Sequence, residues 1–311
     1  MKNYSNSKEI ENIKNKISEA FKGLHLDEET HTYTLNGSQL ISTTTYLKRF
    51  SDSFNSFHAS EAKGKKMARI NANDRRTGQY YRARWKYVRE EASNAGNRVH
   101  MYAECFPDFD LPCDWKEQAI LDFYEWLPEN YEVLFLELRV YDEDTMHAGT
   151  VDGLLYNKDT GNLVIYDWKT NSRNINELYK NKNLKGKFKK LKSTSLNKYS
   201  IQLSDYANMI ETHTDFKVEE RWIVWLRQKP LNKKDQDRSS DYTIRKVKCD
   251  VNKPNFKLYK VADLTKIIDS SYKDDKENLK KLSKPAKVSK GLFTKKTKAY
   301  DKNKKGMFTK K

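Results

Sequence analysis

The stretch His147–Asn171, HAGTVDGLLYNKDTGNLVIYDWKTN, decides the fold that we expect for this chain. Its two apolar runs flank the polar segment 158–161, a pattern typical of two antiparallel strands and their turn. A symmetric four-residue loop places Asn157 opposite Asn162. One face of the second strand is then apolar and consists of Val164, Tyr166 and Trp168. The stretch therefore predicts a mostly buried β-hairpin.

This hairpin carries charges where burial makes them costly. In the same register Asp152 lies opposite Asp167, and opposed residues of two strands have Cβ atoms roughly 5 Å apart. Lys169 lies two residues past Asp167 and shares its face of the strand. Buried carboxylates that face each other must be protonated or compensated, and one lysine compensates only one of them. A divalent cation would resolve the conflict, because hard cations take carboxylate oxygens as ligands. The alternative is an ordinary Asp–Lys surface pair on an edge hairpin.

The net charge of the 311-residue chain is +17 and is unevenly distributed. Residues 280–311 contain thirteen lysines and one acid, so they contribute +12 of the total. This balance suits a polyanionic partner, with nucleic acid the leading candidate, although a lysine-rich tail can also serve only solubility. The tail repeats KGLFTKK at 290–296 as KGMFTKK at 305–311, and its composition predicts disorder.

Cysteine usage and hydropathy indicate the compartment. Cys105, Cys113 and Cys249 form no CxxC pair, which argues for a reducing compartment and against a disulfide framework. No apolar run has the length of a membrane span, and residues 1–16 lack the apolar region of a secretory signal. We therefore expect an intracellular, cytoplasmic protein without a membrane partner.

Hydrophobic periodicity predicts both helices and strands along the chain. Helices are expected from Ser42 with a hydroxyl cap, and over 7–22, 60–104 with an interruption near 71–78, 114–127 capped by Asp114, 198–212 and 256–272. Strands are expected in a hairpin around Asn36-Gly37, and over 131–141, 221–228 and 241–249. This order fits an α/β fold with a mixed central sheet flanked by helices.

Two basic segments are candidates for contact with DNA. Residues 63–89 contain ten Lys/Arg and one acid, interleaved with aromatic residues, and residues 172–198 contain nine Lys/Arg and one acid in a long loop or lid. Aromatic stacking combined with cationic contacts tolerates any base sequence and suits single-stranded DNA, although some of these aromatic residues must belong to the core. The candidate contacts are Tyr81, Arg82, Arg84, Trp85, Lys86, Arg89, Lys185, Lys187, Lys189 and Lys190.

Gly149-x-x-Asp152, followed after fourteen residues by Asp167-Trp168-Lys169, resembles the PD-(D/E)XK nuclease superfamily. The resemblance is greatest to its branch of RecB-type exonuclease domains and mitochondrial genome maintenance exonucleases. Further motifs similar to those of that branch occur in the expected order, namely Gly96-x-x-x-His100, Glu137 in LFLELRV and Gln202-x-x-x-Tyr206. Residues 33–47, YTLNGSQLISTTTYL, are similar to the segment that opens many phage exonucleases of this type. The resemblance covers roughly residues 30–250.

The resemblance implies a restriction-endonuclease-like core and a metal centre. Asp152 and Asp167 would bind one or two Mg²⁺ or Mn²⁺ ions, and the Trp168 carbonyl would add an oxygen ligand. His100 would complete the metal shell, whereas Glu137 would be either a ligand or a neighbour that supports the ligands. The iron–sulfur members of the branch carry four cysteines around the nuclease core. This chain has three, placed elsewhere, so we expect no iron–sulfur cluster.

The remaining motif residues would serve catalysis and DNA contact. Lys169 would orient water for in-line attack on the phosphodiester or stabilise charge. Gln202 would orient Lys169 or the attacking water, and Tyr206, one helical turn further on, would meet the DNA strand. We therefore expect a metal-dependent DNA exonuclease that acts on single-stranded DNA or DNA ends, with a role in replication, recombination or repair in a bacterial or phage-infected cell.

Three alternatives remain open from the sequence. The first is a structure-specific or restriction-type endonuclease, and the second is a non-catalytic DNA-binding module with the same fold. The third is an interaction protein whose repeated tail docks a sliding clamp or a single-strand-binding protein. The expected organisation is an N-terminal amphipathic helix at 1–29, a nuclease domain at 30–272 with a DNA-guiding helical part at 60–128 and a core at 131–250, and the tail at 273–311.

Overall fold

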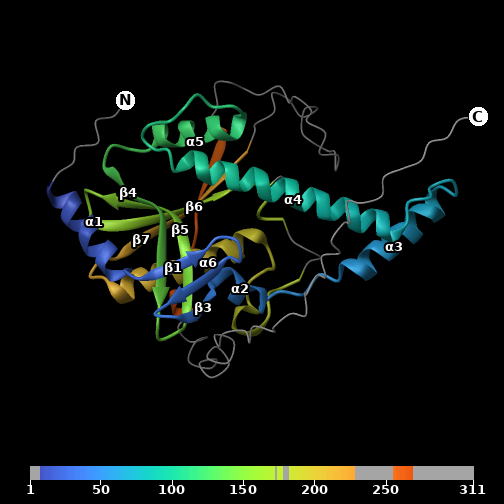
Figure 1. Cartoon of the computed structure of the whole chain (residues 1–311), viewed down its shortest axis with the longest axis horizontal. Helices are drawn as coiled ribbons and strands as arrows, with labels where there is room; N and C mark the ends of the chain where they lie inside the picture. Colours follow the sequence, from blue (N-terminus) through green and yellow to red (C-terminus); the bar gives the residue numbers. More distant parts are fainter. Residues whose placement is uncertain (1–7, 172–173, 178–181, 228–254, 269–311) are drawn as a thin grey trace, which may run out of the picture.

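The computed structural model describes residues 8–171, 174–177, 182–227 and 255–268 (Figure 1). Its helices are α1 (Lys8–Ala20), α2 (Thr43–Lys48), α3 (Ser56–Ile70), α4 (Gly78–Ala103), α5 (Trp115–Trp126) and α6 (Ser195–His213), with a 3₁₀ turn η1 at Gly186–Phe188. Its strands are β1 (Leu24–Asp27), β2 (Thr32–Leu35), β3 (Ser38–Ser42), β4 (Tyr131–Asp142), β5 (His147–Asn157), β6 (Asn162–Lys169), β7 (Val218–Leu226) and β8 (Phe256–Lys260). The strand expected over 241–249 and the tail at 273–311 lie outside the described residues.

The described strands form one mixed sheet, which confirms the expected α/β class. The strand order is β1-β2-β3-β5-β6-β7-β8, and β4 pairs with β5. The pairs β3–β5 and β6–β7 are parallel, whereas the other pairs are antiparallel. Helix α6 lies between β6 and β7 in the chain, as the crossover of a parallel pair requires.

The central hairpin has the register that the turn predicted. Asn157 pairs with Asn162, and the same register continues as far as Gly153 opposite Tyr166. At the other end of β5, β3 pairs only with His147 and Ala148. Among the described strands, neither β3 nor β6 pairs with residues 149–152, so the sheet is open along this part of β5 on the edge opposite β4.

Two layers of helices cover the sheet. Alternate residues of β6 point to opposite faces, and the face with Leu163 and Ile165 shares a core with α1 and α6. The other face, with Tyr166 and Trp168, packs against α5 and the C-terminal part of α4, as the apolar face of the hairpin predicted. Ile17 of α1 is fully buried in the first core. The N-terminal segment 1–29, which the sequence set apart from the domain at 30–272, therefore packs with that domain through α1. One face of helix α5 belongs to the second core, and its expected place in a DNA-guiding part stays a prediction.

Local chemistry explains several element boundaries. Asn36 and Gly37 have φ angles of 50° and 77°, the left-handed pair that a tight hairpin turn needs. The side chain of Ser42 accepts a hydrogen bond from the Thr45 N–H and caps α2, and Asp114 caps α5 in the same way. These turn and cap residues stand where the sequence predicted them.

The predicted helix over 256–272 is wrong in its first part. Residues 256–260 form β8, which pairs antiparallel with β7 from Trp222 to Leu226. A short segment such as FKLYK fits both a helical and an alternating pattern, so periodicity alone does not decide between them. The unpaired edge of β7 decides in favour of a strand, because a buried edge needs hydrogen-bond partners. Helical backbone begins at Thr265 and continues to the end of the described segment.

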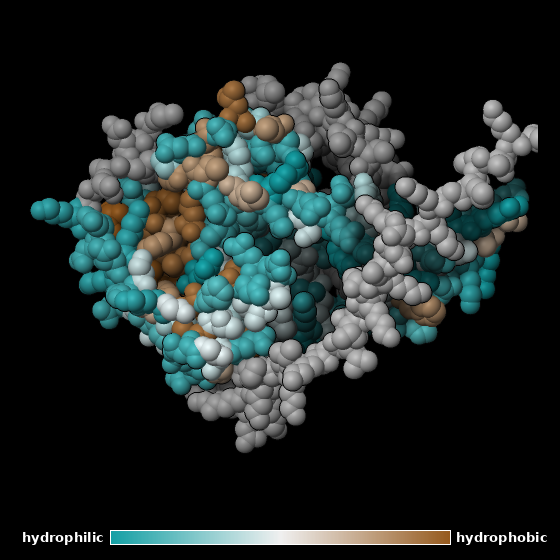
Figure 2. All heavy atoms as spheres, in the orientation of Figure 1, coloured by the Kyte–Doolittle hydropathy of each residue, from teal (hydrophilic) through white to brown (hydrophobic). Residues whose placement is uncertain are grey.

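Helix α3 and the first half of α4 form an arm that projects from the sheet, which we define as residues 56–89 (Figure 1). The two helices approach closely, since a Cβ on Gly64 would lie 3.0 Å from the Gly78 nitrogen. Arg82 Nη1 donates to Ser60 Oγ and Glu61 Oε1, both at 2.8 Å, and ties the helices together. Hydrophilic residues cover most of the arm, whereas apolar residues gather where β4 crosses the same view (Figure 2).

Candidate metal centre and active site

Three acids from three adjacent strands meet beside the open part of the sheet. The β4–β5 pairs Leu136–Gly153 and Leu138–Val151 flank Glu137 and Asp152, so these two acids lie opposite each other. The β5–β6 ladder ends at Gly153 and Tyr166, and Asp167 follows on β6 near enough to Asp152 for its pKa to be raised by that carboxyl group. Asp152 is 8 % exposed and Asp167 is 2 % exposed. The fold therefore gathers three carboxylates in a largely buried row, where the hairpin alone predicted two.

Glu137 and His100 close one end of this row. His100, on the C-terminal half of α4, places its Nδ1 atom 2.9 Å from Glu137 Oε1 and 3.7 Å from Asp152 Oδ1. Glu137 has a φ of 50°, an uncommon backbone conformation for a side chain of this kind. Such a residue costs roughly 1–3 kcal/mol and is found where the surroundings hold a side chain in a particular place, often at functional sites.

Lys169 and Gln202 close the other end. Lys169 Nζ forms an ion pair with Asp167 Oδ2 and lies 4.6 Å from the centre of the Tyr199 ring. Gln202 Nε2 lies 3.4 Å from Asp167 Oδ1 and donates to the Tyr206 hydroxyl at 3.1 Å. The structure thus brings Asp152, Asp167, Lys169, Gln202, His100 and Glu137 together in one cluster, as the resemblance implied.

In the open part of the sheet, the Asp152 side chain contacts the backbone of β6. Its Oδ2 atom accepts a hydrogen bond of 2.7 Å from the Trp168 N–H, a backbone group that a strand partner would otherwise bind. The Trp168 ring is 2 % exposed and lies in the second core, which anchors this end of β6. A carboxylate that replaces a backbone acceptor is held in one position. The expected role of the Trp168 carbonyl stays a prediction.

The electrostatics of the cluster favour uptake of positive charge. Burial raises the pKa of Asp152, against the attraction of His100 and Lys169. Burial and the neighbouring Asp152 raise the pKa of Asp167 to about 6, although Lys169 acts in the opposite direction. Burial opposes a charge on His100, but the Asp152 and Glu137 carboxylates outweigh this effect and raise its pKa to about 9. Burial also opposes a charge on Lys169, and the two aspartates raise its pKa above the ordinary value.

These donors fit a divalent cation. One ligand atom from each of His100, Glu137 and Asp152 lies within 4.8 Å of the other two. Two ligands of one Mg²⁺ ion can be roughly 4.2 Å apart, twice the metal–oxygen distance, so small side-chain adjustments would suffice. A cation would also replace the proton that His100 otherwise carries and would compensate the acids that Lys169 does not pair with. His100 would then have to be neutral, because only a neutral imidazole ligates metal.

The structure corrects the expected role of Tyr206. This side chain is 3 % exposed and packs in the first core, so it does not meet a DNA strand. A Cβ on Gly149 would lie 2.2 Å from Tyr206 Cε1, which explains why glycine precedes Asp152 in the motif. Tyr206 instead holds Gln202 toward Asp167. At Gly96, by contrast, a Cβ would lie 3.9 Å from Thr170 Oγ1, so packing against the described residues does not require glycine there.

Sequence reasoning missed two features of the site. Tyr199, whose ring faces the Lys169 ammonium, lies one helical turn before Gln202, and this spacing could have revealed it. Asp205 is 1 % exposed, accepts a 2.5 Å hydrogen bond from Thr43 Oγ1 and lies 3.4 Å from His147 Nδ1. This contact joins α2, β5 and α6 beside the open part of the sheet. No local signal could have shown it, because the partners are distant in the chain.

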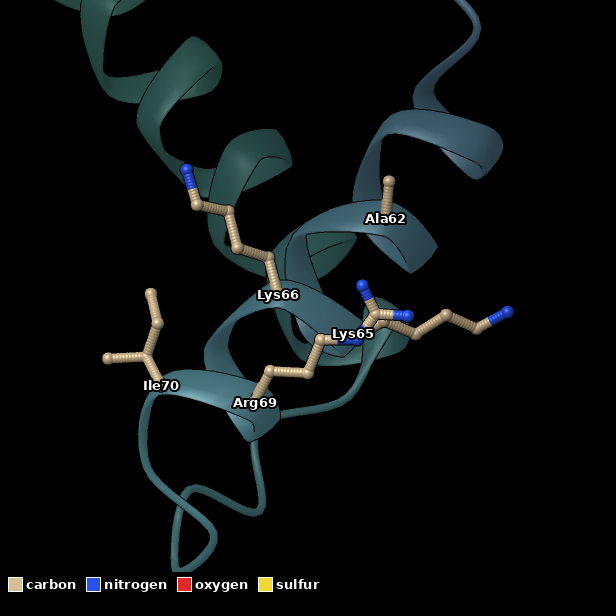
Figure 3. A pocket seen from close by; sticks show the side chains of 5 residues that line it. All are labelled: Ala62, Lys65, Lys66, Arg69 and Ile70. Carbon is tan, nitrogen blue, oxygen red and sulfur yellow. The ribbon is translucent and has the colours of Figure 1, made fainter.

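The expected DNA contacts on the arm differ in how exposed and how engaged their side chains are. Tyr81 is 5 % exposed, so its predicted contact with DNA is wrong, and Arg82 is engaged with Ser60 and Glu61. Lys86 and Arg89 are exposed, and Arg84 and Trp85 are half-buried. On α3, a hollow of about 460 Å³ adds cations that the sequence did not single out (Figure 3). Its lining residues are Ala62, Lys65, Lys66, Arg69 and Ile70.

The described part of the basic insert packs against the segment after α2. Phe188 is fully buried and its ring lies 4.8 Å from that of Phe50. Lys182 and Lys185 form ion pairs with Asp52 at 2.6 and 2.7 Å, which engages one of the expected DNA contacts. Lys187 is half-buried, and Lys189 and Lys190 are exposed. Residues 172–173 and 178–181 of the expected lid lie outside the described residues.

Comparison with known proteins adds no assignment. No family model matches the chain, and no curated protein matches it significantly. Within the described ranges, no helix combines the length and the apolar character needed to cross a membrane.

Proposed function

We propose that this protein is a metal-dependent DNA exonuclease of the PD-(D/E)XK type, which hydrolyses phosphodiester bonds at the cluster around Asp152 and Asp167. One observation carries the proposal. Motifs that are widely separated in the sequence converge, so that Glu137, Asp152 and Asp167 lie in a row with Lys169 at one end and His100 at the other. Carboxylates and a lysine in contact are the groups that metal-assisted phosphodiester hydrolysis uses.

The residues of the cluster would have different roles in hydrolysis. His100, Glu137 and Asp152, whose ligand atoms lie together, would hold a Mg²⁺ or Mn²⁺ ion, and Asp167, which is paired with Lys169, would join them as a further ligand. The bound cation would neutralise phosphate charge and lower the pKa of a water molecule. Lys169, whose pKa is raised by the aspartates, keeps its proton near neutral pH. Its part is therefore to position the nucleophile and stabilise negative charge rather than to accept a proton.

The substrate follows from charge and shape. The arm carries exposed cations on both helices, such as Lys65, Lys66, Lys86 and Arg89, and phosphate contacts of this kind bind DNA without regard to sequence. Exposed Tyr80 and Tyr87 offer surfaces for base stacking, which favours unpaired strands or frayed ends. The lysine-rich residues 280–311 would tether the enzyme to DNA, or to a sliding clamp or single-strand-binding protein.

End-labelled single-stranded and double-stranded DNA tests the proposal. The wild type should degrade it with Mg²⁺ or Mn²⁺ and not with EDTA, and Lys169→Ala should reduce the rate by roughly 10²–10³-fold, as for loss of one charge-stabilising group. Lys158→Ala, at the turn of the same hairpin, is the matched control and should keep full activity. Equal rates for the wild type and Lys169→Ala would refute the assignment.

Closed-circular single strands separate exonuclease from endonuclease. An exonuclease needs an end and should leave circles intact while it degrades linear strands of the same sequence. Cleavage of circles by the wild type, but not by Lys169→Ala, would replace the exonuclease by the structure-specific or restriction-type endonuclease. Binding without hydrolysis under every metal condition would instead support the non-catalytic DNA-binding module.

A further inference from the structure

A pocket of about 460 Å³ lies directly beside the metal centre. Helices α2 and α6, which are side by side (Figure 1), form two of its walls, and the segment that leads from α2 to α3 forms the third. Its volume is within the range of roughly 300–1,000 Å³ that is usual for small-molecule sites. The lining residues are Thr44, Leu47, Lys48, Ser51, Asp52, Ser53, Phe54, Lys198, Tyr199 and Gln202.

The pocket and the centre share two side chains. Gln202 lines the pocket and lies 3.4 Å from Asp167 Oδ1. Tyr199 lines it as well, and its ring is 4.6 Å from Lys169 Nζ. A group bound in the pocket therefore lies one side chain away from the acids and the lysine.

The lining combines aromatic and cationic groups. Phe54 is 61 % exposed and its ring lies 5.8 Å from that of Trp85 on the arm, so the pocket is continuous with the arm. Lys48 and Lys198 supply positive charge at the wall. The negative charge of Asp52 is compensated by Lys182 and Lys185 of the insert. A solvent-exposed aromatic ring beside two lysines fits a ligand that has both a flat ring and a phosphate.

We propose that this pocket binds one unpaired nucleotide of the substrate, next to the phosphodiester bond that is cleaved. The base stacks on Phe54, and the adjoining phosphate lies near Lys48 and Lys198. A base that stacks in this pocket has left its duplex stack, so the pocket selects single strands or frayed ends at the point of cleavage. This inference rests on the proposed nuclease function and extends it to the recognition of the base.

Oligonucleotides with a single abasic position test the pocket. Linear strands carrying the abasic unit at each position near either end are compared with the intact strand, both for hydrolysis with Mg²⁺ and for binding by fluorescence anisotropy in EDTA. At one position, loss of the base should raise the KM of the wild type and weaken its binding, each by roughly 5- to 150-fold. This is the range that stacking of one base on an aromatic residue corresponds to. Phe54→Ala should show a similarly raised KM and weakened binding with the intact strand. This variant should no longer distinguish the intact strand from the abasic strand.

Phe57→Ala is the matched control. Phe57 is also exposed, at 56 %, but its ring lies under the Arg82 guanidinium outside the pocket, so this variant should still distinguish the two strands. Undiminished discrimination by Phe54→Ala, or none by an active wild type, would overturn the pocket assignment and leave the nuclease function standing. Conversely, discrimination in EDTA without any hydrolysis in Mg²⁺ would refute the nuclease function while supporting a nucleotide pocket.

Discussion

Replacing Lys169 by methionine should destabilise the metal-free protein by an amount that grows with pH. Lys169 forms an ion pair with Asp167, and their side chains are only 17 % and 2 % exposed. Methionine has a similar length, so it keeps the packing against Tyr199 while removing the positive charge. The carboxyl group of Asp167 must then either stay charged without its partner or take up a proton.

The pKa of Asp167 determines how large this loss of stability should be. In the wild type it is raised to about 6 by burial and by Asp152, although Lys169 opposes this. An opposite charge in contact lowers a carboxyl pKa by roughly one to three pH units, so the variant's Asp167 should titrate at roughly pH 7–9. Below about pH 6 Asp167 is protonated in both folded proteins, and the pH-dependent part of the difference vanishes. Above the variant's pKa, the variant should lose roughly 1.4–4 kcal/mol of unfolding free energy relative to the wild type.

Urea unfolding in EDTA at a series of pH values measures this difference. The gap between the wild type and Lys169→Met should open as the pH rises through about 6. The double variant Lys169→Met/Asp167→Asn should close the pH-dependent gap, because asparagine cannot carry the charge. A gap that does not change with pH, or one that persists in the double variant, would show that Lys169 does not compensate Asp167.

Three further outcomes are expected. Mg²⁺ should raise the thermal midpoint of the wild type more above pH 9 than at pH 6, because Asp167 and His100 must release protons to ligate it. Scanning fluorimetry measures this stabilisation and should show none in Asp152→Asn. A stabilisation by Mg²⁺ that becomes smaller as the pH increases would contradict the ligand set. Gly149→Ala should lower the unfolding free energy by roughly 1–3 kcal/mol through the clash with Tyr206, and Tyr206→Leu should restore part of it in urea titrations; an unaffected single variant would refute the contact. Changing Lys86 and Arg89 to glutamine should reduce the salt dependence of single-strand binding in EDTA by roughly 0.7 per lost phosphate contact, whereas the same number of changes on α1 should not; equal slopes would exclude the arm from DNA contact.

Much of the fold could be predicted from local signals. The turn 158–161 determined the hairpin register, because the two-residue period of a strand leaves few ways to bury one face. Asn36-Gly37, Ser42 and Asp114 marked a turn and two helix starts, because their side chains or backbone angles act within a few residues. The same locality failed at 256–260, where the edge of β7, and not the segment itself, made a strand.

The candidate site was predictable only in part. Counting residues from one turn placed Asp152 level with Asp167, and the observed ladder follows that register up to Gly153 and Tyr166, one pair before them. Glu137 was predicted as a site residue only from the family resemblance. The pairing of β4 with β5 and the φ of 50° at Glu137 show how its side chain comes to lie beside Asp152. Tyr206 was misjudged, because spacing on a helix indicates a shared face but not whether that face is covered.

The sequence by itself determined the charged hairpin, the helices that flank it and the basic surplus, because turn chemistry, periodicity and charge are properties of neighbouring residues. Only the tertiary structure decided that β3 and β6 leave residues 149–152 open, that Asp152 binds the Trp168 N–H there, and that Thr43 meets Asp205 across the chain. The physical reason is that burial and long-range pairing depend on how all elements pack together. The same packing brings His100 and Glu137 to Asp152, a group of ligand atoms that could hold a metal ion.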